Sequence, residues 1–180
     1  MSLDALRETL PAYAKDLSLN LSSLAAETVL NDQQKWGCFV AAAYAAGAGP
    51  MIRATVASAR EAGLSDEALE AAKGSAAIMA MNNVYYRALH IMRGGEEYRA
   101  LPARLRMTLI GNPGVDKCDF ELWSFAVSAI NGCGMCMDAH ESELKKSCCT
   151  NVQIQAALRI AAVVNAVSRV LVAESALVPA

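Results

Sequence analysis

Helix start and stop signals recur along the whole chain, and they constrain its fold more than any other feature. Residues that cap helix N-termini precede apolar stretches with helical spacing, and Gly or Pro follows many of these stretches. No segment shows the sustained alternation of a half-buried strand. Because 54% of the 180 residues are hydrophobic but only 6% are aromatic, the apolar content is mainly aliphatic and suits close helix packing. The sequence therefore predicts an all-α fold.

The same signals predict the individual helices. We expect them from Ser2 to Leu10, from Pro11 past Leu21, from Asn31 or Asp32 to the breaker at Gly47–Pro50, from Met51 to Ala62, from Ser65 toward Tyr86, from Lys117 to Ile130, from Cys133 to Ser147 and from Asn151 to Ser175. Residues 93–114 contain two Gly/Pro breakers, so we expect a connector with one short helix from Leu101 to Ile110.

The two halves of the chain resemble each other. Trp36 aligns with Trp123 at an offset of 87, and alanine-rich segments further on align at an offset of 85. We expect both tryptophans to anchor the core. The sequence thus predicts a single domain, residues 1–180, that is a duplicated multi-helix unit, with a structural copy at approximately 31–87 and a reactive copy at 117–175.

The duplication predicts where the chemistry lies, because the first half lacks the reactive groups of the second. At the offset of 87, the reactive residues align with inert or non-basic ones: Cys133 with Ala46, Cys136 with Gly49, His140 with Arg53 and Glu121 with Gln34.

Charge and hydropathy exclude some partners. A net charge of −2 and a pI near 5.7 give no basic surface for nucleic acid. The N-terminal residues are partly acidic, and the longest charge-free stretch, Trp36 to Ile52, is too short to cross a membrane. We expect a cytoplasmic protein with neither a membrane nor a nucleic-acid partner. In a reducing cytosol, six cysteines indicate a redox or metal role more than a structural disulfide framework.

A thiol pair and a histidine share one helix face. Cys133, Cys136 and His140 fall within about 60° of one another at helical spacing. Since Asn131-Gly132 ends the preceding helix, the pair occupies the first turns of a new one, where free N–H groups stabilise a thiolate. This arrangement is typical of a low-pKa pair in which one sulfur attacks and the other resolves the product as a disulfide.

A carboxylate completes the predicted relay. His140 is placed to take the proton of Cys136, one turn earlier, and Glu121 on the neighbouring antiparallel helix is the candidate to orient the imidazole. The pattern predicts a Glu–His–Cys relay, but the spacing leaves the distance between Glu121 and His140 open.

Other interpretations compete with this one. The pair can lack a redox role, or it can form a structural zinc site that only Cys148 and Cys149 would complete. His140 and Glu121 can be solvated helix residues. We expect Cys38 and Cys118 to be packing residues, and Cys148 and Cys149 to be incidental thiols, with an auxiliary redox role as the lesser option.

The spacing of Glu121, Cys133-x-x-Cys136 and His140, within ELWSFAVSAINGCGMCMDAH, resembles the alkylhydroperoxidase D family of the carboxymuconolactone decarboxylase-like superfamily. The resemblance extends to LPAYAKDLSLNLSSL, AAIMAMNNVYYR and LRMTLIGNPGVDK, so it covers nearly the whole chain. One departure is Met135, where some family members carry a second histidine; methionine cannot transfer a proton.

The resemblance implies an all-α duplicated fold, a homotrimer, and a thiol peroxidase with no bound cofactor or metal. It also implies that the enzyme reduces the peroxiredoxin alkyl hydroperoxide reductase C. Electrons would come from dihydrolipoamide on a lipoyl-carrier protein, the dihydrolipoyl acyltransferase component of a 2-oxoacid dehydrogenase. Dihydrolipoamide dehydrogenase would keep this carrier reduced with NADH.

The family's residue roles carry over by position. Cys136 would form the sulfenic acid, and Cys133 would be the proton donor and the resolving thiol of a Cys133–Cys136 disulfide, as well as the site of the mixed disulfide with the peroxiredoxin. His140 and Glu121 would relay the proton. Two alternative functions stay open, a carboxymuconolactone decarboxylase-like enzyme, which needs no thiols, and a zinc-stabilised interaction module.

Overall fold

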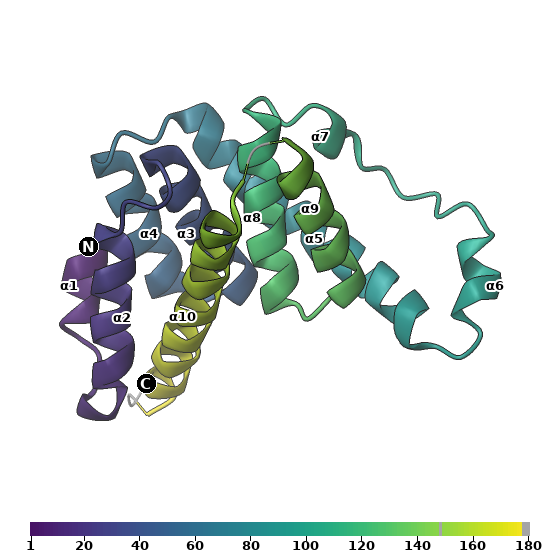
Figure 1. The fold of residues 1–180 in the computed structure, drawn as a ribbon. Helices are drawn as coiled ribbons and strands as arrows, with labels where there is room; N and C mark the ends of the chain where they lie inside the picture. Colours follow the sequence, from purple (N-terminus) through teal and green to yellow (C-terminus); the bar gives the residue numbers. More distant parts are fainter. Residues whose placement is uncertain (148, 178–180) are drawn as a thin grey trace.

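The computed structural model describes residues 1–147 and 149–177, and these residues contain helices and loops but no β-strand. The all-α prediction is therefore confirmed. The helices are α1 (Leu3–Arg7), α2 (Lys15–Ala26), α3 (Asp32–Ala46), α4 (Gly49–Glu61), α5 (Asp66–Ile91), α6 (Gly95–Arg99), α7 (Thr108–Gly111), α8 (Lys117–Ile130), α9 (Gly134–Ser147) and α10 (Asn151–Ser175), with a 3₁₀ turn, η1 (Ala12–Ala14), before α2 (Figure 1).

Local capping bonds set the starts of the long helices. Asn31 accepts a hydrogen bond from the Gln34 backbone N–H at 2.8 Å, while the Gln34 side chain accepts from the Asn31 N–H. Thr150 and Gln153 form the same reciprocal pair before α10. Ser65 accepts from the first turn of α5. Because these bonds satisfy otherwise unpaired N–H groups, the helices begin where the sequence predicts.

The connector between α5 and α8 differs from the prediction. A single helix from Leu101 to Ile110 is wrong, because two short helices, α6 and α7, flank a non-helical stretch at residues 101–107. Pro102 disfavours helical geometry in the residue before it, and Arg104 has a positive φ of 52°. The α6 segment consequently stands away from the main body as an arm, and the chain returns along α7 (Figure 1).

The core is centred on α3, which packs against α4, α5, α8 and α10. Trp123 on α8 is fully buried, and its indole N–H donates to the Gln34 carbonyl at 3.2 Å. Trp36 is 9% exposed and stacks at a tilt on Phe39. Both tryptophans are core residues, as expected. Gly37 lets α3 approach the Trp123 indole, since a β-carbon at this position would overlap the ring.

Two sets of three helices match in length and order. The helices α3, α4 and α5 have 15, 13 and 26 residues, and α8, α9 and α10 have 14, 14 and 25. All three pairs of helices begin at a constant offset of 85 residues, so the helix starts do not follow the offset of 87 between the tryptophans. This correspondence supports the duplication, which stays a prediction.

α10 is the one helix within the described residues that is long and apolar enough to cross a membrane by length and composition. It packs against α2, α3 and α8, and it buries Ile160, Val164 and Val167 in the shared core. These contacts are those of a core helix.

We expect Gly37→Ala to destabilise the protein by about 1–3 kcal/mol, because the added methyl group overlaps the rigid Trp123 ring. Urea unfolding followed by tryptophan fluorescence measures the loss. Gly94→Ala is the control, since nothing lies within 4 Å of a β-carbon there, and its effect should stay within about 0.5 kcal/mol. Equal stabilities of the two variants would contradict the close approach of α3 to Trp123.

Candidate active site

The turn between α8 and α9 places the thiol pair at a helix start. Gly132 adopts a left-handed conformation with φ of 66°, which reverses the chain after α8. The Cys133 N–H donates to the Ser128 carbonyl at 3.1 Å, and the Cys133 carbonyl accepts from the Met137 N–H at 2.9 Å. Cys133 is therefore the residue that precedes α9, and Cys136 lies in the first turn. Free N–H groups at this end favour a negative charge on sulfur.

The two cysteines form a disulfide, with their Cα atoms 5.3 Å apart. The prediction that they lie close enough to react with each other is confirmed. Their surroundings differ, because Cys133 is fully buried whereas Cys136 is 7% exposed and lines a cavity. A molecule that enters this cavity contacts Cys136.

Glu121 and His140 form a hydrogen-bonded pair between α8 and α9. His140 Nδ1 lies 2.6 Å from Glu121 Oε2, and only 12% and 9% of the two side chains are exposed. The distance that the sequence left open is therefore a direct hydrogen bond. When the Nδ1–H group donates a hydrogen bond to the carboxylate, the imidazole is neutral and its free lone pair is on Nε2. Nε2 lies 3.3 Å from Met79 Sδ, and both residues line the cavity that Cys136 also lines.

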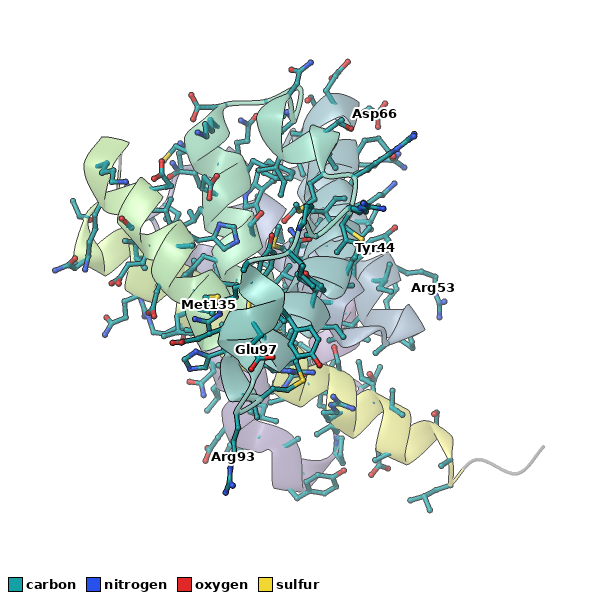
Figure 2. The ribbon with its side chains drawn as sticks, turned by 90° about the vertical axis from the view of Figure 1, so that its right-hand side faces the viewer. Tyr44, Arg53, Asp66, Arg93, Glu97 and Met135 are labelled. Carbon is teal, nitrogen blue, oxygen red and sulfur yellow. A yellow bond between two sulfur atoms is a disulfide. The ribbon has the colours of Figure 1, made fainter. Side chains whose placement is uncertain are left out.

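A cavity of about 360 Å³ adjoins Cys136 and His140. Its walls come from α5, from the return of the connector at α7, and from α9, and the residues are Met79, Asn82, Tyr86, Met107, Ile110, Met135, Cys136, Ala139 and His140. Figure 2 looks at the molecule from the side of the α6 arm and labels Met135 on α9. Met135 thus adds apolar surface to the cavity wall. The lining suits a small apolar molecule with one reactive polar group.

The cavity includes residues that the sequence analysis missed. Met79, Asn82 and Tyr86 lie on one face of α5, in the first half of the chain, although all the chemistry was expected in the second half. Their spacing of three and four residues is helical. The signal in the sequence was an asparagine pair, Asn82-Asn83, within the otherwise apolar centre of a long helix.

Hydrogen bonds from α5 hold the turn that precedes Cys133. Asn83 is 1% exposed, donates to Ser128 Oγ at 3.0 Å, and accepts from the Asn131 side chain at 2.9 Å. Arg87 donates to the Asn131 carbonyl. Ser128 and Asn131 both belong to the α8–α9 corner, so α5 fixes the position of the reactive pair from across the helix interface.

The remaining cysteines lie apart from this site. Burial raises the pKa of the Cys38 thiol well above its ordinary value, and the Asp119 carboxylate adds to this shift. Burial likewise raises the pKa of Cys149, whose sulfur lies 3.4 Å from that of Cys118, a contact that the sequence did not predict. Cys148 lies outside the described residues.

This arrangement does not support the four-cysteine zinc site. Cys133 and Cys136 lie at the start of α9 and Cys149 lies beyond its end, and a 14-residue helix is about 20 Å long. Within the described part of the chain, no three His, Cys, Asp or Glu side chains gather as metal ligands would.

Comparisons with known proteins show which family the chain belongs to. Residues 96–178 match the family model described as the carboxymuconolactone decarboxylase family. Three relatives are each named alkyl hydroperoxide reductase AhpD. The chain is 61% identical to the one from Maricaulis maris, over 97% of this chain and 100% of the relative. It is 62% identical to the one from Hyphomonas neptunium, over 98% and 97%, and 54% identical to the one from Streptomyces coelicolor, over 98% and 98%. The chain therefore belongs to the AhpD family.

We expect cysteine alkylation of the reduced, folded protein to follow this geometry. Cys136 should react first with limiting iodoacetamide, because it lines the cavity at a helix start. Cys38 should stay unmodified, because its raised pKa lowers the fraction of reactive thiolate at neutral pH and burial blocks access. Peptide mass mapping measures both, and unfolding in urea, which should expose Cys38, is the control. Labelling of Cys38 ahead of Cys136 would contradict the described site.

Proposed function

We propose that the protein is an antioxidant oxidoreductase, a thiol-dependent alkyl hydroperoxide reductase whose redox centre is the Cys133–Cys136 pair. The observation that carries the proposal is the disulfide itself, at the wall of an apolar cavity that it shares with His140, which is hydrogen-bonded to Glu121. The printed name of the AhpD relatives points to the same reaction.

The catalytic cycle begins with the dithiol. His140 Nε2 takes the proton of Cys136, and Glu121 holds the imidazole in the required tautomer and stabilises the imidazolium. The Cys136 thiolate attacks one oxygen of the hydroperoxide, the O–O bond breaks, and the departing alkoxide takes a proton from Cys133. Cys136 is now a sulfenic acid.

The second step closes the disulfide. The Cys133 thiolate attacks the sulfur of the sulfenic acid, and the departing hydroxide takes the proton from His140 and leaves as water. In sum, two thiols and one hydroperoxide give one disulfide, one alcohol and one water. The buried position of Cys133, beside Cys136 and away from the cavity, suits a resolving thiol.

Electrons return through an external dithiol. We propose dihydrolipoamide on the dihydrolipoyl acyltransferase component of a 2-oxoacid dehydrogenase as the donor, and the peroxiredoxin alkyl hydroperoxide reductase C as a protein that this enzyme reduces in turn. The resemblance assigned the mixed disulfide with the peroxiredoxin to Cys133. Burial favours Cys136 instead, because Cys133 has no exposed surface and Cys136 lines the cavity.

The proposal also includes a cytoplasmic homotrimer. In its support, large apolar side chains are exposed at the end of α5 and on the α6 arm, where Ile91 is 70%, Tyr98 51% and Leu101 61% exposed. A contact with another copy of the chain would remove these groups from water. Sedimentation velocity tests the trimer directly, and a single species with the mass of one chain would contradict it.

We expect Cys133→Ser and Cys136→Ser each to abolish turnover of an alkyl hydroperoxide with dihydrolipoamide, because neither variant can form the disulfide. Consumption of the hydroperoxide is the measurement. Cys38→Ser is the matched control, since this buried thiol lies outside the site and its loss should leave turnover unchanged. Full activity of Cys136→Ser would contradict the proposed function.

We expect His140→Gln and Glu121→Gln each to slow turnover by about 10²-fold, the typical scale for loss of a general base. The two effects should not add in the double variant, because the residues act as one hydrogen-bonded unit. The rate of Cys136 alkylation should fall in parallel, since fewer thiolates form. His90→Gln, at an exposed histidine, is the control. Unchanged alkylation in His140→Gln would rule out a proton relay to Cys136.

The family match leaves one second candidate, a decarboxylase of the carboxymuconolactone type, because the matched model carries that description. This reaction needs no thiols. Decarboxylation of the lactone acid by folded protein alkylated at Cys133 and Cys136 would support this candidate, and its absence in the unmodified protein would exclude it.

A further inference from the structure

Asn82 has a buried amide oxygen without a hydrogen-bond partner in the described structure, and this residue lines the same cavity as the reactive cysteine. Its side chain is 5% exposed and lines the cavity with Cys136 and His140. Its Oδ1 atom is buried and has no hydrogen-bond partner among the described residues. A buried polar group without a partner destabilises a folded protein, so such a group in an active-site cavity indicates a missing ligand.

The neighbouring residue, Asn83, shows that an asparagine on α5 can have its amide fully hydrogen-bonded. Asn83 bonds to Ser128 and Asn131 and leaves neither end of its amide unpaired. Asn82 lies as far from the start of α5 as Val167 lies from the start of α10, and Val167 is fully buried. The matching position in the other half of the chain thus holds an apolar residue. Packing alone does not require an amide at residue 82.

We propose that Asn82 binds the –OOH group of the hydroperoxide substrate and is a catalytic residue; this inference rests on the proposed function. The remaining cavity walls are mainly apolar and hold the alkyl group. The amide of Asn82 turns toward the bound substrate, so that Oδ1, which is buried in the described structure, accepts the hydrogen bond of the peroxide O–H and orients the O–O bond toward Cys136. The amide NH₂ group donates to the oxygen that leaves as alkoxide.

The hydrogen bond from the Asn82 amide stabilises the negative charge that develops on the departing oxygen. As the Cys136 thiolate attacks, negative charge moves from sulfur to the departing oxygen, and a donor at that oxygen stabilises the transition state more than the ground state. The proton that completes the alcohol still comes from Cys133. Asn82 itself is neither oxidised nor reduced.

Asn82→Leu tests the proposal, because leucine has a similar volume and no polar atoms. The fully reduced variant is mixed with tert-butyl hydroperoxide, and mass spectrometry follows formation of the Cys133–Cys136 disulfide over time. Alkylation of Cys136 by iodoacetamide and the urea midpoint are measured on the same protein. Asn165→Leu on α10 is the matched control, since Asn165 also has a buried amide oxygen without a partner in the described structure but lies outside this cavity.

We expect Asn82→Leu to slow the hydroperoxide step by about 10²-fold, the scale of losing one transition-state donor. The alkylation rate should stay unchanged, and the urea midpoint should stay equal or rise, because an unpaired polar atom has been removed. Asn165→Leu should leave the hydroperoxide and alkylation rates unchanged. If Asn82→Leu does not fold, Asn82→Ala is measured in the same way.

Two results would overturn the assignment of Asn82. One is an unchanged hydroperoxide rate, and the other is an equal loss of the hydroperoxide and alkylation rates, which would place the effect on the thiol and not on the substrate. If the parent protein itself fails to form the disulfide with hydroperoxide, the proposed function fails, and the role of Asn82 fails with it.

Discussion

The hydrogen bond between Glu121 and His140 is the interaction on which the rest of the site depends. A carboxylate that is almost fully buried requires a partner, and here the partner is an imidazole one helix away. This bond exists only because Gly132 reverses the chain and brings α9 back along α8. The same reversal places Cys133 at the start of α9 and Cys136 in its first turn. One turn of the chain thus sets the distance between carboxylate and imidazole, and it also exposes the thiol pair to the helix dipole.

The site belongs to both halves of the chain. The proposed duplication separates a structural copy from a reactive one, but α5 of the structural copy crosses α8 and α9 and completes the cavity. Asn83 and Arg87 hold the α8–α9 corner. Met79 contacts His140, and Asn82 contributes an amide oxygen without a partner in the described structure. The first copy therefore lacks the redox residues but supplies the wall against which they act.

Local signals in the sequence predict most of the helices, because capping and left-handed glycines act within a few residues. The bounds of α8 and α10 agree with the prediction at both ends. The prediction of one helix in the connector between α5 and α8 is wrong, because Pro102 and Arg104 interrupt an otherwise helical pattern. For the site, motif spacing found the four reactive candidates, whose roles stay predictions. It could not find Asn82 or the contact between Cys118 and Cys149, because these depend on packing between segments far apart in the sequence.

The central claim is that Cys133 and Cys136 cycle between dithiol and disulfide at the expense of a hydroperoxide. It is tested most directly by thiol titration and peptide mass mapping of the reduced wild-type protein before and after one equivalent of alkyl hydroperoxide. The account predicts the rapid loss of two thiols, a single new disulfide between Cys133 and Cys136, and its fast reversal by dihydrolipoamide but slow reversal by glutathione. Retention of both thiols, or stable oxidation at other cysteines while this pair stays reduced, would contradict it.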